Sequence, residues 1–150
     1  MTAPRPNLRR YDLGIYPYAL DVPPRFNDMD ALRHLNNVAL AAVYEEGRIA
    51  LHRKLAMDDL REKNTRTVVA QVNIGYLLEG SYPDMLTIGG GFSRIGKSSY
   101  EIAQGLFQNG RCIGVCDTVI VNTRDGRSHP LTDAWKARLD TLRIEGTRDA

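Results

Sequence analysis

The sequence predicts an α+β fold in which a curved antiparallel sheet of about five strands wraps around one long helix, with a short helix near the C-terminus. Three observations lead to this prediction. Apolar residues recur with a helical period after Asn36, and from Thr67 onward they recur with the two-residue period of strands. The later strands are separated by two-residue connections that contain glycine, which are typical of hairpins.

Size and composition favour one soluble domain. The chain has 150 residues, of which 43% are hydrophobic, enough to bury a core without disulfides or metal. Its 20 basic and 18 acidic residues are interspersed, so neither a nucleic-acid nor a membrane partner is indicated. The longest apolar run, residues 38–44, is far shorter than the roughly 20 residues of a membrane span. With no signal-peptide pattern at the N-terminus, we expect a cytoplasmic protein.

The N-terminal region divides into a tail and a first strand. Residues 1–15 contain Pro4 and Pro6 and show no periodicity, so we expect a flexible tail followed by a single domain over residues 16–145. Large residues alternate over residues 16–26, which indicates a strand. Pro23 and Pro24 cannot donate to a sheet, so this strand should lie at an edge or contain a bulge.

The long helix should begin at Asn36 and Asn37, residues that often cap helices. Its first half is apolar on every side, which predicts burial inside the domain, whereas its second half carries charge and should reach solvent. The helical period is carried by Leu40, Val43, Tyr44, Gly47, Leu51 and Leu55.

Four long strands should follow as an antiparallel meander. The strands are expected at residues 67–78, 85–95, 98–108 and 111–123. Three consecutive glycines, residues 89–91, would weaken their strand, so we expect sharp curvature or close approach of another segment there. Cys112 and Cys116 should share one face of the last strand as reduced packing residues, too far apart to bond. Asp117 interrupts an apolar series and should be paired or lie at an interface.

The terminal helix follows Pro130. Thr132 can cap it, and one apolar stripe is formed by Trp135, Leu139 and Leu142. This helix completes the predicted α+β fold.

The segment between the first strand and the long helix carries the most specific motif. Residues 28–37 read DMDALRHLNN, and residues 45–48 in the helix read EEGR. These segments resemble the hotdog-fold acyl-CoA thioesterases of the 4-hydroxybenzoyl-CoA thioesterase-like group, which carry D-x-D-x-x-G-H-x-N-N followed by E-E-x-R. Looser matches at residues 79–86 and 94–99 extend the similarity from about Tyr16 to Trp135. The chain departs from the pattern at Arg33, where the family has glycine, and at Leu40, where it often has tyrosine.

The resemblance implies a hotdog homodimer whose two sheets join edge to edge, with active sites at the subunit boundary and further pairing into tetramers. It also implies that Asp30 is the catalytic carboxylate and that the backbone amide near Asn37 is the oxyanion donor. Ser98 or Ser99 would reach the substrate from the neighbouring subunit. The implied substrate is a thioester of CoA or of acyl carrier protein.

These implied roles agree with the chemistry of thioester hydrolysis. The N-terminus of a helix carries unpaired N–H groups and partial positive charge, which would stabilise an oxyanion. Asp30 could act as general base or as nucleophile, and the sequence leaves both routes open. The leaving thiol, with a pKa of about 8.5, needs little help from an acid. His34 would support the reaction by orienting the carboxylate or the water.

The remaining candidates are substrate-binding residues. Arginine and lysine at turns could pair with the phosphates of CoA. The candidates are Asn36, Arg94, Lys97, Ser98 and Arg127. Glu45 is a reserve candidate for the catalytic carboxylate. The three histidines lack metal-ligand spacing, so we expect no metal, and no cofactor is needed because CoA belongs to the substrate.

Two other functions are compatible with the same sequence. One is a hotdog dehydratase or hydratase acting on acyl-CoA. The other is a non-hydrolytic module that binds acyl-CoA or lipid, suggested by Arg33 in place of glycine.

Overall fold

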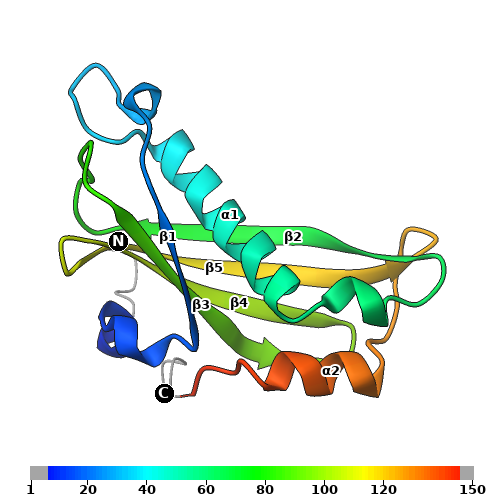
Figure 1. Ribbon diagram of the computed structural model, residues 1–150. Coiled ribbons are helices and arrows are strands. Elements are labelled where there is room, and N and C mark those ends of the chain that lie inside the picture. The colour runs from blue at the N-terminus through cyan, green and yellow to red at the C-terminus, as the bar shows by residue number, and fades with distance from the viewer. Residues whose placement is uncertain (1–6, 146–150) are drawn as a thin grey trace, which may run out of the picture.

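A computed structural model describes residues 7–145 and shows one antiparallel sheet curved around the helix α1, Asn37–Lys54 (Figure 1). Along the sheet the main strands lie in the order β1-β3-β4-β5-β2. Their bounds are Tyr18–Val22 (β1), Thr65–Tyr76 (β2), Leu86–Ile95 (β3), Ser99–Gln108 (β4) and Arg111–Arg124 (β5), and the two-residue β6, Arg127–Ser128, pairs with β5. The predicted fold class is confirmed, including the short C-terminal helix.

The predicted four-strand meander is wrong in one respect. Strands β3, β4 and β5 do form a meander, but β2 pairs with β5 at the edge of the sheet farthest from β1. Hairpins fix the order of β3, β4 and β5, because each two-residue turn forces its strands to be neighbours. Residues 77–85 are long enough to carry the chain across the sheet, so adjacency in sequence did not imply pairing there.

Helix α1 begins where the sequence predicts. The side chain of Asn36 accepts a hydrogen bond from the Ala39 N–H at 2.7 Å, which caps the first turn. The helix packs closely on β3 because Gly47 has no side chain; a Cβ there would lie 2.8 Å from Ile88. The N-terminal half is not buried all round, however, since Val38 is 75% exposed.

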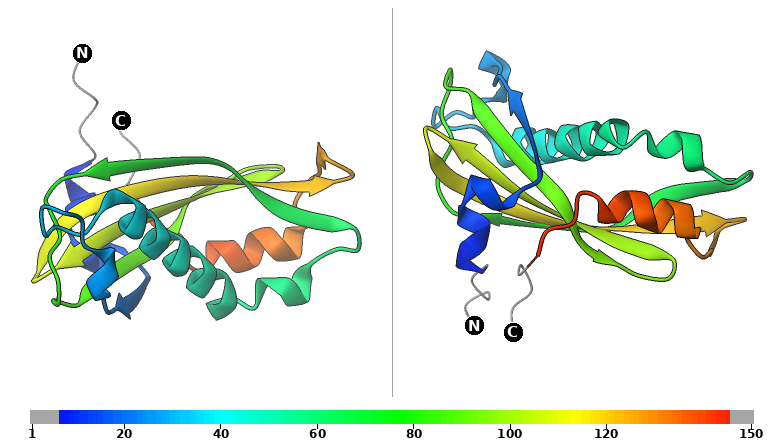
Figure 2. Two further views of the ribbon diagram at one scale, coloured as in Figure 1. Left: turned by 90° about the horizontal axis from the view of Figure 1, so that it is seen from above. Right: turned by 60° about the horizontal axis from the view of Figure 1, so that its bottom comes forward.

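Part of the predicted flexible tail is ordered. Residues 1–6 lie outside the described part of the chain, but residues 7–15 form two 3₁₀ helices, Leu8–Tyr11 and Leu13–Ile15, on the face of the sheet opposite α1 (Figure 2). Arg10, only 5% exposed, forms an ion pair with Asp117 at 2.7 Å. It also donates to the carbonyl oxygens of Gln104 and Cys116. One buried arginine thus anchors a segment that has no apolar periodicity.

The glycines of β3 allow other segments to approach this same face. A Cβ on Gly89 would lie 2.8 Å from the ring of Tyr16, and a Cβ on Gly91 would lie 2.5 Å from Ile144. The predicted close approach is therefore confirmed at both positions.

Cys112 and Cys116 are free thiols, but they do not share a face. A bulge opposite Leu106 and Phe107 shifts the register of β5. Cys116 therefore packs in the core beneath α1, whereas Cys112 packs beside Phe107 on the opposite face.

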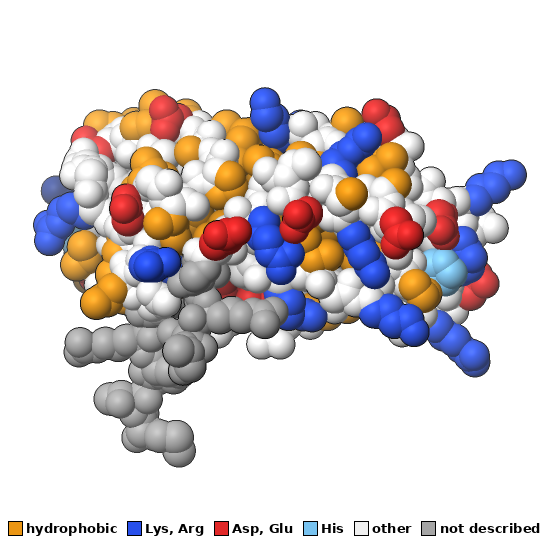
Figure 3. Space-filling view, turned by 90° about the horizontal axis from the view of Figure 1, so that it is seen from below, with side chains coloured by type: hydrophobic (Ala, Val, Ile, Leu, Met, Phe, Trp, Pro, Cys, Tyr) orange, Lys and Arg blue, Asp and Glu red, His pale blue; other side chains and the backbone are white. Residues whose placement is uncertain are grey.

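The terminal helix α2, Asp133–Asp140, is capped by Thr132, whose hydroxyl oxygen accepts from the Trp135 N–H at 3.1 Å. Trp135 and Leu139 are buried in one cluster with Leu51 of α1 and with Met57, and Leu142 packs against this cluster, which confirms the predicted stripe. No helix within residues 7–145 is long and apolar enough to cross a membrane. Charged side chains of both signs are spread over the face seen from below in Figure 3.

Candidate functional site

The motif segment forms a narrow loop closed by backbone hydrogen bonds. The Asn36 N–H donates to the Asp28 carbonyl oxygen at 2.8 Å, and the Asp30 N–H donates to the His34 carbonyl oxygen at 2.8 Å. A turn closes the tip, where the Arg33 N–H donates to the Asp30 carbonyl oxygen at 3.0 Å. The loop therefore holds its side chains at fixed places directly before α1.

The backbone explains the departure from the family pattern at Arg33. This residue has φ of +66°, in the left-handed region that glycine adopts without strain. An L-residue pays about 1–2 kcal/mol for the same conformation, so arginine can replace glycine without changing the path of the loop. The side chain of Arg33 is exposed.

Asp30 has one carboxylate oxygen fixed by the loop and one free. Its Oδ1 accepts hydrogen bonds from the backbone N–H groups of Leu32 and His34, at 2.9 Å and 3.2 Å. Its Oδ2 has no partner among residues 7–145 and is available to a water molecule or a substrate. The residue is exposed and lines a hollow of about 450 Å³ together with Phe26, Asn27, Met29 and Arg33.

The N-terminus of α1 opens into a second pocket, of about 290 Å³. Asn37, the first residue of the helix, lies in its wall, and within residues 7–145 the N–H groups of Asn37 and Val38 have no acceptor. The other lining residues are mostly apolar: Leu35, Leu40, Tyr76, Leu77, Leu78, Glu79 and Gly80. This pocket can hold an apolar acyl group with its carbonyl oxygen at the end of the helix.

His34 contacts one residue from the lining of each hollow, Asp30 and Glu79. Its backbone is hydrogen-bonded to Asp30, and its Nε2 lies 2.9 Å from Oε2 of Glu79, in the wall of the second pocket. Sequence reasoning missed Glu79 because the pairing joins segments that are far apart in the chain. No spacing rule would have revealed it.

The other candidates do not meet Asp30 within one subunit. Ile95 pairs with Tyr100 at one end of the β3-β4 hairpin, whereas the motif loop lies beyond the other end (Figure 1). Arg94, Lys97, Ser98 and Arg127 all belong to that far end. Arg94 donates to the hydroxyl of Ser99 at 3.3 Å, and Arg127 is exposed on β6.

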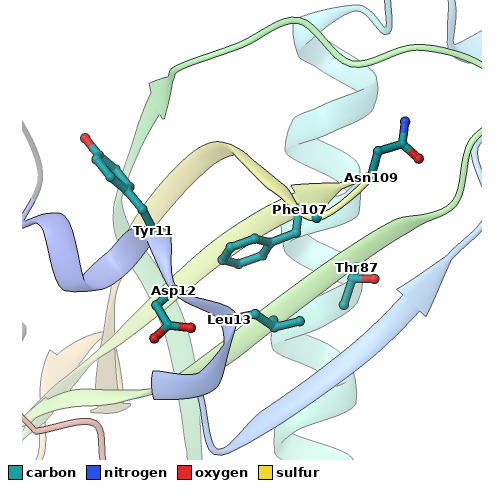
Figure 4. Close-up of a pocket in the computed structure, with 7 residues that line it drawn as sticks. Tyr11, Asp12, Leu13, Thr87, Phe107 and Asn109 are labelled. Carbon is teal, nitrogen blue, oxygen red and sulfur yellow. The ribbon is translucent and has the colours of Figure 1, made fainter.

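A third hollow, of about 240 Å³, lies on the opposite face of the sheet, away from the motif. Leu13, Thr87 and Phe107 gather over β3 and β4, while the ring of Tyr11 points away from them (Figure 4). Asp12 already caps a turn by accepting from the Gly14 N–H at 2.9 Å. Within residues 7–145 its lining shares no residue with the two hollows beside the motif.

The geometry does not favour a cysteine nucleophile or a metal site among the described residues. Burial raises the pKa of both Cys112 and Cys116, so these thiols are poor candidates for an ionised nucleophile near neutral pH. Among residues 7–145 no three metal-ligating side chains come together.

Comparisons with known proteins identify the family and related structures of the same fold. The family model of the thioesterase-like superfamily matches residues 24–139. A predicted thioesterase from Bacillus stearothermophilus is 27% identical and superposes with a TM-score of 0.77, covering 86% of this chain and 98% of its own. A thioesterase from Thermus thermophilus, complexed with coenzyme A and zinc, is 29% identical with a TM-score of 0.76, covering 85% and 94%. A thioesterase superfamily protein from Jannaschia is 25% identical with a TM-score of 0.74, covering 85% and 83%. No curated protein matches the chain significantly.

Proposed function

We propose that this chain, which belongs to the thioesterase-like superfamily, hydrolyses an acyl-CoA thioester to a free acid and CoA. The observation that carries the proposal is the open N-terminus of α1 in an apolar pocket, beside a loop that presents the free carboxylate oxygen of Asp30. The similar Thermus thermophilus thioesterase, which is complexed with coenzyme A, supports CoA as the carrier. The free thiols of Cys112 and Cys116 are in keeping with a cytoplasmic enzyme.

In the proposed reaction the thioester oxygen accepts hydrogen bonds from the N–H groups of Asn37 and Val38. Asp30 either removes a proton from the attacking water or attacks the carbonyl carbon itself. In the first route the new C–O bond forms from water, the C–S bond breaks, and the proton passes from Asp30 to the departing thiolate. In the second route the carboxylate oxygen of Asp30 bonds to the carbonyl carbon, the C–S bond breaks and the thiolate departs. Water then hydrolyses the acyl-aspartyl anhydride to the free acid and the Asp30 carboxylate, and the released proton goes to the thiolate. Both routes use the free oxygen of Asp30.

Identification of the products tests this proposal. The purified protein is incubated with saturated and 2,3-unsaturated acyl-CoAs and with acyl carrier protein thioesters, and the products are analysed by mass spectrometry. Free acid and free CoA are the expected products. A hydrated acyl-CoA with its thioester intact would instead indicate a hydratase, and hydrolysis of only the carrier-protein thioesters would change the proposed carrier.

We also propose that the active form is a homodimer joined through the outer edges of two β2 strands. This edge has no neighbouring strand within residues 7–145, and it carries Val69 and Tyr76 at 54% and 52% exposure. A second subunit would cover this apolar edge.

The dimer would also bring the separated candidates together. In an antiparallel pairing of two β2 strands, the Thr65 end of one strand lies beside the Tyr76 end of the other. Thr65 pairs with Arg124, at the end of the sheet that is farthest from the motif loop and that also carries Arg94, Lys97, Ser98 and Arg127. The partner's cations would therefore lie near the motif loop, where they could bind the phosphates of CoA.

Val72→Arg is expected to prevent this dimer. Val72 is exposed on the side of β2 that faces α1, and a charge there would be buried by the partner. The variant should have a mass near 16.8 kDa in light scattering, whereas the wild type should have twice that, and thioester hydrolysis should be lost with the dimer. Gln71→Arg, an exposed neighbour on the opposite side of β2, is the matched control. A monomeric wild type, or a fully active monomeric Val72→Arg, contradicts the proposed dimer.

A further inference from the structure

We propose that Glu79 is a positioning residue for His34 in the hydrolysis, an inference that rests on the proposed function. The motif of the sequence does not include Glu79. Its carboxylate nevertheless lies 2.9 Å from Nε2 of His34 and in the wall of the pocket at the helix N-terminus. The pair thus links the loop that carries Asp30 to the wall of the pocket at the N-terminus of α1.

The backbone holds this pair in place. Leu35 and Gly80 directly follow His34 and Glu79 in the chain. The Leu35 N–H donates a hydrogen bond to the Gly80 carbonyl oxygen at 2.9 Å. Gly80 is buried, and a Cβ there would lie only 3.0 Å from the side chain of Leu35. The two segments are therefore packed together independently of the two side chains. The contact between Glu79 and His34 follows from this packing and not only from the reach of two long side chains.

The contact determines which nitrogen of His34 can act. The carboxylate of Glu79 can act only as a hydrogen-bond acceptor, so Nε2 of His34 must carry a proton. In the neutral imidazole the lone pair is then on Nδ1. Within residues 7–145 Nδ1 has no hydrogen-bond partner. It can accept a hydrogen bond from the attacking water, while the other proton of that water goes to Asp30. Glu79 would thus fix the tautomer and the orientation of the ring without touching the substrate carbonyl.

The same pair contributes little to folding, which makes the role testable. The side chains of His34 and Glu79 are 41% and 69% exposed, and ion pairs between exposed side chains contribute little to protein stability. Glu79→Gln should therefore fold normally. Because the amide can present either its oxygen or its NH₂ group to Nε2, the variant no longer enforces one tautomer.

The test is a double-mutant cycle in kcat and KM with the acyl-CoA that the wild type hydrolyses fastest. Glu79→Gln should lower kcat about tenfold and leave KM within about twofold, as expected for loss of a group that acts through another. In the His34→Gln background the additional Glu79→Gln change should have no further effect, since there is no ring left to position. Glu101→Gln, on the opposite face of the sheet, is the matched control and should behave as the wild type.

Three results would overturn the inference, and they differ from failure of the proposed function. They are an unchanged kcat in Glu79→Gln, a rise in KM alone, and full additivity of the two substitutions in the double variant. Each requires an active wild type. A wild type that releases no thiol from any acyl-CoA would overturn both the proposed function and the role of Glu79.

Discussion

Asp30→Asn is expected to lower kcat at least about 100-fold while leaving the fold intact, because general bases typically contribute 10²–10⁴-fold to a rate. Asparagine retains an oxygen that can accept from the N–H groups of Leu32 and His34, so the loop keeps its hydrogen bonds. The substitution removes only the negative charge and the basicity of the free oxygen. Steady-state thiol release measures the loss, and thermal unfolding checks the fold.

The matched control is Asp28→Asn, in the same loop. Asp28 is half-buried and accepts from the backbone N–H of Arg25 at 2.8 Å, so it has a structural partner of its own. Asparagine can keep this bond, and turnover should stay within a few-fold of the wild type. If Asp30→Asn retained near-normal turnover, or if both variants lost activity equally, Asp30 would not be the catalytic carboxylate.

Arg10→Met is expected to lower the free energy of unfolding by about 2–4 kcal/mol. Breaking a buried ion pair costs about 3–5 kcal/mol, and the side chain of Asp117 is 34% exposed, which reduces the penalty. The carbonyl oxygens of Gln104 and Cys116 also lose a charged donor. Burial alone would lower the pKa of Arg10, but the attraction of Asp117 and Tyr16 outweighs it and the pKa is raised. Urea denaturation measures the effect.

Two further variants distinguish loss of the Arg10–Asp117 ion pair from a general effect of substitution in this segment. Arg9→Met changes the exposed neighbour of Arg10 and should alter stability by no more than about 0.5 kcal/mol. In the double variant Arg10→Met and Asp117→Val, part of the lost stability should return, because the unpaired carboxylate is gone. An Arg10→Met variant as stable as Arg9→Met would mean that residues 7–15 do not anchor to the sheet.

Features that depend on neighbouring residues could be predicted from the sequence. Asn36 and Thr132 cap their helices through hydrogen bonds to residues three positions away, so their sequence context was sufficient. The β3-β4 and β4-β5 hairpins followed from their two-residue turns. The loop of residues 28–37 was also located correctly, since its family pattern is local.

Features that join distant segments could not be predicted. Arg10 reaches Asp117 across more than half of the chain, and His34 reaches Glu79 through a contact that no periodicity encodes. The bulge near Phe107, which separates the faces of Cys112 and Cys116, depends on how two strands meet. The substrate-binding candidates and Asp30 are also on distant segments, and they come close together only across the two subunits of the proposed dimer.

The most direct test of the central claim is thiol release, followed with a colorimetric thiol reagent. The wild type and Asp30→Asn are compared on short-chain, long-chain and aromatic acyl-CoAs. The account predicts steady thiol release by the wild type from at least one of these thioesters, reduced by two orders of magnitude or more, about the general-base contribution, in the variant. No release above the rate without enzyme from any of them would contradict the thioesterase function, and the chain would then be better described as a non-hydrolytic acyl-CoA-binding protein.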